Sequence, residues 1–343
     1  MARLGDQRKC GARVNLVTHI YDNRNGVTFD VSEAVSDMTI TTYLEDNPGK
    51  AEFTVLATSP LAFWEGATVS IMLDGYKMFK GFVFKKSRTE DVKRIKVTCY
   101  DQLRYLKNKD SRVFEGVTSN QIFEQICKDF VLKYKTVDAS SHICAPRSED
   151  ATSLYDMIKH AFHDTLANTG QWYFIRDNFG TLEHLNVKSC VRPEVLGDKS
   201  FVTGFDYETS IDDNVYTQIK LYRDNQTSGK REVFIVNDTV NGGDKLKRWG
   251  ILQLYEKIDE SYNLAQIESR ALKMLKYYCD TRRSLTLHCL GIKEFFAGCI
   301  FKCKIADLGD LSMNSYLMVT ECVHKISNEY HTMDIKTEVV RGE

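Results

Sequence analysis

The residues most suited to chemistry in this sequence are histidines. His160 and His163 lie three positions apart in a stretch with helical periodicity, and His184 follows later in the chain. Two histidines at this spacing could contribute to a metal site, because imidazole is a common metal ligand. However, the pair straddles an apolar stripe, and no carboxylate or cysteine stands at a useful ligand spacing. We therefore interpret these histidines as packed or surface residues.

The cysteines are a second set of candidates. They form no Cys-x-x-Cys pair, and most lie in apolar segments, where cysteine acts as a small core residue. Cys299 and Cys303 lie close together in an expected strand, but core packing explains them better than metal or redox chemistry. A chain of this length does not need a disulfide framework. We predict reduced thiols at Cys10, Cys99, Cys127, Cys144, Cys190, Cys279, Cys289, Cys299, Cys303 and Cys322.

Two acidic pairs, Asp212-Asp213 and Asp259-Glu260, could in principle supply paired carboxylates. A catalytic pair needs convergent, partly buried groups. These pairs lie where turns or helix starts are expected, and we interpret them as caps and solvated turns. The sequence also lacks phosphate-binding, dinucleotide-binding, nucleophile-elbow and zinc-protease motifs. We predict no catalytic, cofactor-binding or metal-binding residues and no cofactor.

The densest charge feature is a basic stripe. It has three interpretations: a solvated hairpin face, an interface with an acidic partner subunit, or a nucleic-acid surface. Overall, 46 Lys and Arg nearly balance 47 Asp and Glu, which argues against a dedicated nucleic-acid binder. No aromatic platform alternates with the basic residues, as single-strand binding would favour. The stripe consists of Lys77, Lys80, Lys85, Lys86, Arg88, Lys93, Arg94 and Lys96.

The 343-residue chain has no apolar run approaching the roughly 18–20 residues that a membrane helix needs. Its first residues are polar and lack the apolar core of a signal peptide. We expect a soluble protein that stays in the compartment where it is made.

The first hundred residues are expected to be almost entirely β. Residues 37–58 predict a hairpin in which Phe53, Val55 and Ala57 alternate with polar neighbours along the returning strand. We expect Phe53 and Val55 to face the barrel and the polar turn at residues 47–49 to extend from it. Asp74-Gly75 is a second hairpin signal. Such closely spaced strands favour a sandwich or barrel. The other strands are expected at residues 67–75, 78–84 and 92–100.

Helical periodicity begins after residue 112. Thr118 and Gln121 form a plausible capping box for a first helix, and a second helix begins near Ser153 and stops at Gly170. A hairpin over residues 172–185 follows. Residues 112–190 therefore predict a compact α/β unit.

After Pro193 the pattern is β again, interrupted by one long helix from about Asn263 to Cys279. Gly66 and Gly298 each open a strand that is followed by a linker, a strand, a polar turn and another strand, which indicates an internal repeat. The expected fold is α+β and mainly β, with two related β-barrels flanking a small α/β domain. The expected domains are residues 1–110, 111–195 and 196–343. The long helix carries an apolar stripe of Leu264, Ile267, Ala271, Leu275 and Tyr278.

Several segments follow one another in a characteristic order. They are residues 79–83, 97–106, 114–118, 153–158, 210–213, 249–253 and 263–266, then the Gly298 segment, and His324 with Met333. No single segment is specific, but in this order they resemble the XkdQ/YqbQ family of baseplate hub proteins from contractile phage tails and phage-like particles. The resemblance runs from about Thr28 to Glu338, and this family is related to the late control protein D group and to the central hubs of larger myophages. It implies that the two flanking β-barrels are tail-tube-like.

The resemblance implies a structural protein and not an enzyme. Such hubs are homotrimers whose two barrels per chain make a six-fold-like ring between the tail tube protein above and the central spike protein below. Other baseplate proteins and the tape measure protein are further implied partners, with no membrane and no specific nucleic acid. The implied location is the baseplate of a virion or tailocin made in the bacterial cytoplasm. The alternatives are a siphophage-type distal tail or host-adhesion hub, and a cell-wall hydrolase.

Overall fold

The computed structural model describes residues 14–56, 61–88, 93–212, 214–225, 229–239, 242–258, 262–309, 312–327 and 329–339. Ala57, Asp213, Asp259, Glu260 and Cys10, which the sequence analysis singled out, lie outside these ranges. The chain divides into two compact units, one of residues 1–206 and 285–343 and the other of residues 207–284. None of the described helices is both long and apolar enough to cross a membrane.

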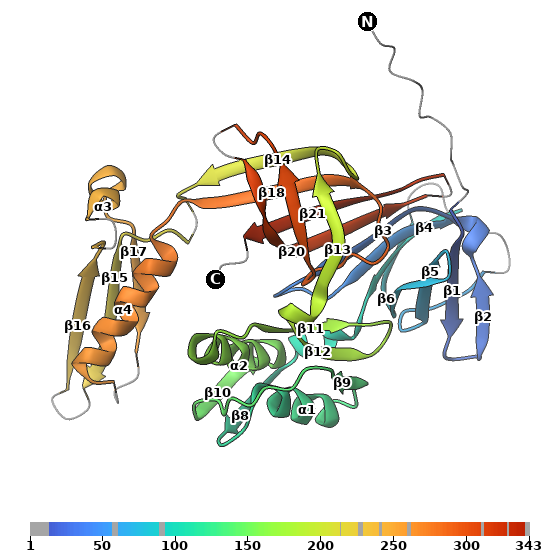
Figure 1. The fold of residues 1–343 in the computed structure, drawn as a ribbon. Coiled ribbons are helices and arrows are strands. Elements are labelled where there is room, and N and C mark those ends of the chain that lie inside the picture. Colours follow the sequence, from blue (N-terminus) through green and yellow to red (C-terminus); the bar gives the residue numbers. More distant parts are fainter. Residues whose placement is uncertain are drawn as a thin grey trace, which may run out of the picture. The chain divides into compact units, whose positions relative to one another are not determined.

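The N-terminal β region is an antiparallel sheet with the strand order β3-β4-β7-β6-β5-β1-β2 (Figure 1). Alternation decides which side of each strand is buried: in β7, Ile95, Val97 and Cys99 are buried, while Arg94 and Lys96 are exposed. The β3–β4 and β5–β6 hairpins confirm two turn predictions. The strands are β1 (Leu16–Asp22), β2 (Val27–Asp30), β3 (Val35–Tyr43), β4 (Lys50–Leu56), β5 (Thr68–Leu73), β6 (Tyr76–Arg88) and β7 (Arg94–Tyr100).

The C-terminal β region has the order β14-β18-β21-β20-β19-β13; the β18–β21, β21–β20 and β20–β19 pairs are antiparallel, and the β19–β13 pair is parallel. Antiparallel pairing of β20 with β3 joins it to the N-terminal region in one continuous sheet. Its strands are β13 (Val191–Gly197), β14 (Val202–Ser210), β18 (Arg282–Leu290), β19 (Ile300–Ile305), β20 (Met313–Ile326) and β21 (His331–Val339).

The predicted repeat is confirmed at the level of hydrogen bonds. Gly66 donates its N–H to Val83 O over 2.8 Å, and Gly298 donates to Val319 O over the same distance. Both glycines have positive φ, and a β-bulge follows each of the two valines. By this correspondence, β5-β6-β7 matches β19-β20-β21, β4 matches β18, and β3 matches β14.

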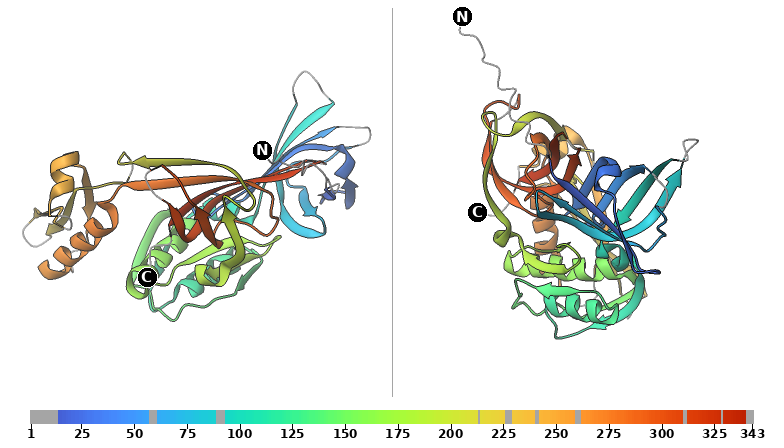
Figure 2. Two further views of the ribbon diagram at one scale, coloured as in Figure 1. Left: turned by 45° about the horizontal axis from the view of Figure 1, so that its top comes forward. Right: turned by 90° about the vertical axis from the view of Figure 1, so that its right-hand side faces the viewer.

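The α/β module lies on one side of the long sheet (Figures 1 and 2). Its first helix has the predicted capping box at Thr118 and Gln121, and its second ends at Gly170 in the left-handed conformation. Both helices bury their apolar faces in one core with Leu103 and Leu106, so the module begins near residue 101 and not at 111. Its elements are η2 (Gln102–Lys107), β8 (Lys109–Phe114), α1 (Ser119–Asp129), β9 (Tyr134–Thr136), β10 (Arg147–Ser153), α2 (Leu154–Thr169), β11 (Tyr173–Asp177), β12 (Leu182–Asn186) and η3 (Val187–Cys190).

The range 196–343, expected to be one domain, is divided by the second unit. The predicted long helix packs there against a local three-stranded sheet, because Ile267, Ala271 and Leu275 share a core with Ile219 and Leu221. Leu264 was expected in the buried stripe but is 65% exposed at the helix start. The elements are β15 (Gln218–Asn225), β16 (Lys230–Asn237), α3 (Asp244–Trp249), β17 (Gln253–Lys257) and α4 (Leu264–Tyr278).

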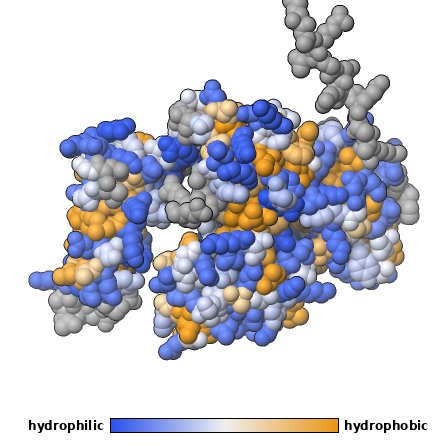
Figure 3. Space-filling view, in the orientation of Figure 1, coloured by the Kyte–Doolittle hydropathy of each residue, from blue (hydrophilic) through white to orange (hydrophobic). Residues whose placement is uncertain are grey.

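The α+β, mainly β fold class is confirmed by this arrangement of strands and helices. Apolar residues also reach the surface: Figure 3 shows a hydrophobic area on the visible face of the sheet around β13, where Val191 and Val195 are exposed. Exposed apolar surface on a sheet of this kind is typical of a protein that packs against partners.

Candidate functional site: the junction of the two β regions and the α/β module

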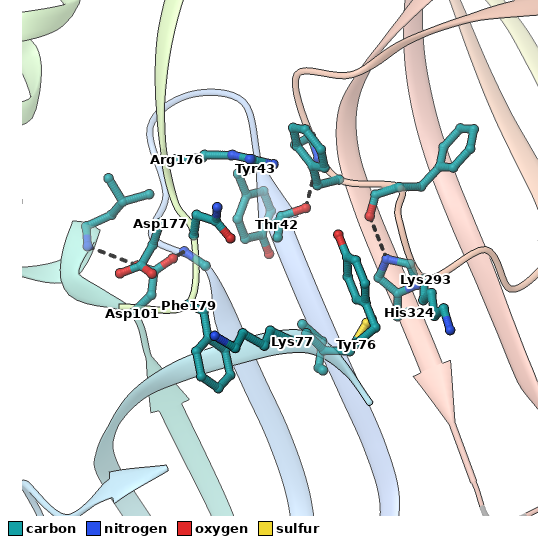
Figure 4. Close-up of a pocket in the computed structure, with 18 residues that line it drawn as sticks. Thr42, Tyr43, Tyr76, Lys77, Asp101, Arg176, Asp177, Phe179, Lys293 and His324 are labelled. Atoms are coloured by element: carbon teal, nitrogen blue, oxygen red, sulfur yellow. Dashed lines mark hydrogen bonds between the residues drawn. The ribbon is translucent and has the colours of Figure 1, made fainter. Parts of the chain in front are cut away.

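The pairing of β3 with β20 creates a junction onto which the α/β module packs. Cys322 lies opposite Thr42 across this pair, and Thr42 Oγ1 accepts a hydrogen bond from Ala297 N over 3.0 Å. A cavity of about 60 Å³ lies at the junction, lined by residues from both β regions and the module (Figure 4). Sites for small-molecule substrates typically measure about 300–1,000 Å³. The cavity therefore suits a few ordered waters and not a substrate.

Asp101 is the central polar residue of this junction. It is 5% exposed and follows the last residue of β7. Its carboxylate accepts the N–H of Gly49 over 2.9 Å and that of Leu103 over 3.0 Å. Gly49 is required here, because a Cβ at that position would lie 2.2 Å from Asp101 Oδ2. One side chain thus ties the β3–β4 turn to the start of η2.

Asp177, at the end of β11, lies beside Asp101 in Figure 4. Its Oδ2 atom accepts hydrogen bonds from the backbone N–H and the side-chain amide of Gln102, over 3.2 and 3.3 Å, and its Oδ1 accepts the N–H of Gly180. Burial, then the charge of Asp177, raises the pKa of Asp101 well above its ordinary value. Burial also raises the pKa of Asp177. Burial and the nearby negative charge therefore favour the protonated form of Asp101.

Two of the cations that line the cavity, Arg176 and Lys77, contact aromatic or acidic partners. Arg176 forms an ion pair with Glu183 over 2.9 Å, and its guanidinium carbon lies 4.0 Å from the ring centroid of Phe296. Lys77 lies 5.2 Å from the ring centroid of Phe179. These contacts join β11 and the following turn to the two β regions. The arrangement serves to hold three parts of the chain together.

Two histidines that sequence reasoning did not single out for chemistry lie at the same junction, with His324 buried and His331 half-buried. His324 Nε2 lies 2.9 Å from Phe295 O, and its Nδ1 lies 2.9 Å from Nε2 of His331. Burial lowers the pKa of each histidine to about 4, so both are neutral at pH 7. A neutral His324 donates through Nε2 and accepts through Nδ1, which makes the pair a chain of hydrogen bonds.

The three candidate histidines are not brought together. His160 Nδ1 contacts Glu149 over 2.9 Å at the surface, and His163 is more than half exposed. His184 is fully buried, with its Nδ1 2.7 Å from Asp138 O. Burial lowers the pKa of His184 to about 4. Across the residues that the structure describes, no group of three His, Cys, Asp or Glu could hold a metal ion.

The other candidates are also dispersed. Cys299, just before β19, and Cys303, within β19, are both fully buried. Burial raises the pKa of each thiol to about 12. All nine cysteines within the described ranges are free thiols, as predicted. Asp212 is exposed at the turn after β14.

The basic stripe is divided between different surroundings. Lys80 lies 5.8 Å from the ring centroid of Phe179, whereas Lys86 donates to Phe63 O over 2.6 Å. Arg94 and Lys96 project from the exposed side of β7. The stripe is therefore several local surfaces and not one continuous groove.

The prediction that the turn at residues 47–49 extends from the barrel is wrong. Pro48 and Gly49 are buried, and the hydroxyl of Tyr155 in α2 donates to Leu44 O over 3.3 Å. Lys159, also in α2, forms an ion pair with Asp46. The turn is covered because the α/β module, which follows it in the sequence, folds back onto it.

We expect Asp101→Asn to reduce the pH dependence of stability. The folded-state pKa of Asp101 lies above the ordinary value of about 3.9, so the folded protein binds more protons in this range. Its contribution to stability is therefore lost as pH rises from about 4 through the folded-state pKa, by up to about 1.4 kcal/mol per pH unit. Urea unfolding of both proteins from pH 4 to 8 measures the difference. Equal slopes would show that Asp101 does not hold a raised pKa.

The comparisons with known proteins agree with this architecture. The chain is 29% identical to YqbQ of Bacillus subtilis strain 168 over 276 residues, which cover 79% of this chain and 80% of that protein. It is equally identical to XkdQ of the phage-like element PBSX from the same organism over 279 residues, covering 79% and 81%.

A solved structure shares the fold. The 43 kDa tail protein of prophage MuSo2 from Shewanella oneidensis superposes with a TM-score of 0.68 and 12% identity, over 94% of this chain and 98% of that one. The model of the YqbQ-like family matches residues 38–338, which include the α/β module, the second unit and most of both β regions, whereas β1 and β2 precede the match. The chain therefore belongs to the YqbQ-like family.

Proposed function

We propose that this protein is a structural baseplate hub of a contractile phage tail or phage-tail-like particle. The observation that carries the proposal is the repeat of one strand arrangement in two β regions joined edge to edge by β3 and β20. Three copies of such a chain present six similar β regions. A closed three-fold ring would then match a six-fold tube on one side and a three-fold spike on the other.

The chemistry of the junction supports a structural role. The cavity is far smaller than ordinary substrate sites, and its acidic and basic side chains bind other parts of the chain. The partners that follow from the proposal are two further copies of this chain, the tail tube protein, the central spike protein, other baseplate proteins and the tape measure protein. The protein would reside in the baseplate of the assembled particle.

The exposed apolar residues favour a second candidate, a siphophage-type distal tail or host-adhesion hub. Trp64 is 47% exposed and lies under the guanidinium of Arg24, 4.4 Å from the ring centroid. An exposed aromatic ring beside a cation could contact a host polysaccharide. A cell-wall hydrolase is the remaining alternative, and it requires a catalytic site in the assembled particle.

Native mass spectrometry of the purified chain, with cryo-electron microscopy of the particle, tests the proposal. We expect a mass of three chains and a ring between tube and spike below a contractile sheath. A single copy per particle would contradict the ring. A non-contractile tail would favour the distal-tail hub, and clearing of cell walls in a zymogram would favour the hydrolase.

A further inference from the structure

The junction inside the chain provides a template for a contact between chains. The β20 edge that faces away from β21 pairs with β19 over its first half and with β3 after the bulge, where Glu321 lies opposite Tyr43. The loop before β19 completes this contact, because Ala297 N donates to Thr42 Oγ1 on β3. The internal junction thus needs a long strand, a loop beside it and an incoming strand.

The N-terminal β region repeats the first two of these features but not the third. In β6, pairing with β5 ends at Phe82, and pairing with β7 continues past the bulge to the end of the strand. By the repeat, Lys85–Ser87 correspond to Glu321–Val323, which pair with β3. In the described part of the chain, β7 pairs with one edge of this segment of β6, and no strand pairs with its other edge. An unpaired strand edge of this kind is a template for another strand.

The loop beside this open edge carries the counterpart of a junction residue. Ala67 N donates to Trp64 O over 3.1 Å, as Cys299 N donates to Phe296 O over 3.2 Å. Trp64 therefore corresponds to Phe296, which lines the internal cavity and contacts Arg176. Phe296 is half-buried at the internal junction, whereas Trp64 is 47% exposed. A large exposed aromatic side chain at this position favours burial in a contact.

The strand that matches β3 in the other region is β14. It is the last strand at its end of the sheet, and its side away from β18 pairs with no strand that the structure describes. Phe205 on this strand is 39% exposed, and the side chain of Asp206 is 80% exposed. Asp206, which also contacts His288 Nε2 over 3.0 Å, complements the exposed Lys85 on the open edge of β6, whereas Lys86 is already paired with Glu65 and Phe63 O. Opposite charges across a contact favour the correct pairing of strands.

We propose that β14 of one copy pairs with the open edge of β6, Lys85–Ser87, in a second copy, and that this contact buries Trp64. The inference deepens the proposed ring and rests on it. The contact is head to tail, because each copy offers a β6 edge to one neighbour and a β14 edge to the other. Contacts of this kind close into a ring when the rotation permits.

Two variants test the two sides of the contact. Trp64→Glu damages the β6 side and leaves β14 intact, whereas Phe205→Glu does the reverse. Both residues are exposed in the single chain, so the fold should be retained. Val113→Glu is the matched control, because Val113 is 76% exposed in the α/β module, outside both edges. Circular dichroism verifies the fold, and sedimentation velocity measures the assembly.

We expect the wild type and Val113→Glu to form the same closed assembly. Each edge variant should stay monomeric up to concentrations at least tenfold higher than the concentration at which the wild type assembles. An equimolar mixture of the two edge variants should form a dimer, because one intact β14 edge then meets one intact β6 edge. If a dimer forms in this mixture but not in a solution of either variant by itself, the contact is head to tail.

Two outcomes would overturn the inference in different ways. If both edge variants form trimers as readily as the wild type, the ring uses another surface, and the proposed function stands without this contact. If the wild type does not self-associate at any concentration and is a single copy in the particle, the contact and the proposed ring both fail.

Discussion

Phe53→Asp is expected to abolish folding of the N-terminal β region and, with it, assembly of the protein. Phe53 is 1% exposed on the inner side of β4, opposite Val97 of β7. Replacement removes a large core side chain, which costs about 3–5 kcal/mol. It also buries a carboxylate without a partner, at a cost of several kcal/mol more. The sum approaches the total stability of an ordinary domain, about 5–15 kcal/mol.

The measurement is the yield of soluble protein together with its circular dichroism and urea unfolding. Two substitutions on the same strand serve as controls. Lys50→Ala removes a partly exposed ion pair with Glu52 and should change stability by about 0.5 kcal/mol or less. Thr54→Asp places the same carboxylate on the opposite side of the strand and should be tolerated. Normal assembly of Phe53→Asp would mean that this side of the β3–β4 hairpin does not face a core.

Gly298→Ala should cost several kcal/mol and loosen the α/β module from the C-terminal β region. Gly298 has φ of +104°, and a Cβ there would lie 2.3 Å from the ring of Phe174 in β11. Positive φ at a non-glycine residue costs about 1–3 kcal/mol. The clash adds to this, because Phe174 is 2% exposed and has little room to move.

The repeat supplies the control. Gly66 occupies the matching position, with φ of +87° and nothing within 4 Å of an added Cβ. Gly66→Ala therefore carries the backbone strain without the clash, and we expect a loss of only about 1–2 kcal/mol. Urea unfolding gives the free energy of unfolding of both variants. The difference between their losses measures the contribution of the close packing of Phe174 against the loop. Equal losses would indicate that this close approach does not contribute to stability.

Local signals were sufficient to predict most elements. The alternation of Ile95, Val97 and Cys99 with basic residues decided which face of β7 is buried. Thr118 with Gln121 marked a helix start, and Gly170 marked a helix end, because these residues satisfy or terminate the backbone hydrogen bonds of a helix. The internal repeat was visible because Gly66 and Gly298 each open the same order of strand, linker, strand, polar turn and strand.

The candidate site could not be predicted in this way. Asp101 and Asp177 are 76 positions apart, and each has local backbone partners that explain it as a cap or turn residue. Only the packing of the α/β module onto the β3–β4 turn places them side by side and buries Asp101. The same packing covers Pro48 and Gly49, which by themselves are typical of an exposed turn.

The sequence by itself determined most of the strands, the helices α1, α2 and α4, the free cysteines and the resemblance to one family of tail proteins, but not β1, β2, β8 or α3. The tertiary structure decided that β3 pairs with β20, that residues 207–284 form a separate unit, and that two carboxyl groups meet at the junction. Pairing of strand edges uses backbone N–H and C=O groups, which almost every residue carries. The sequence therefore contains little information about which strands pair, whereas burial of one face of a strand or helix produces a periodic spacing of apolar residues.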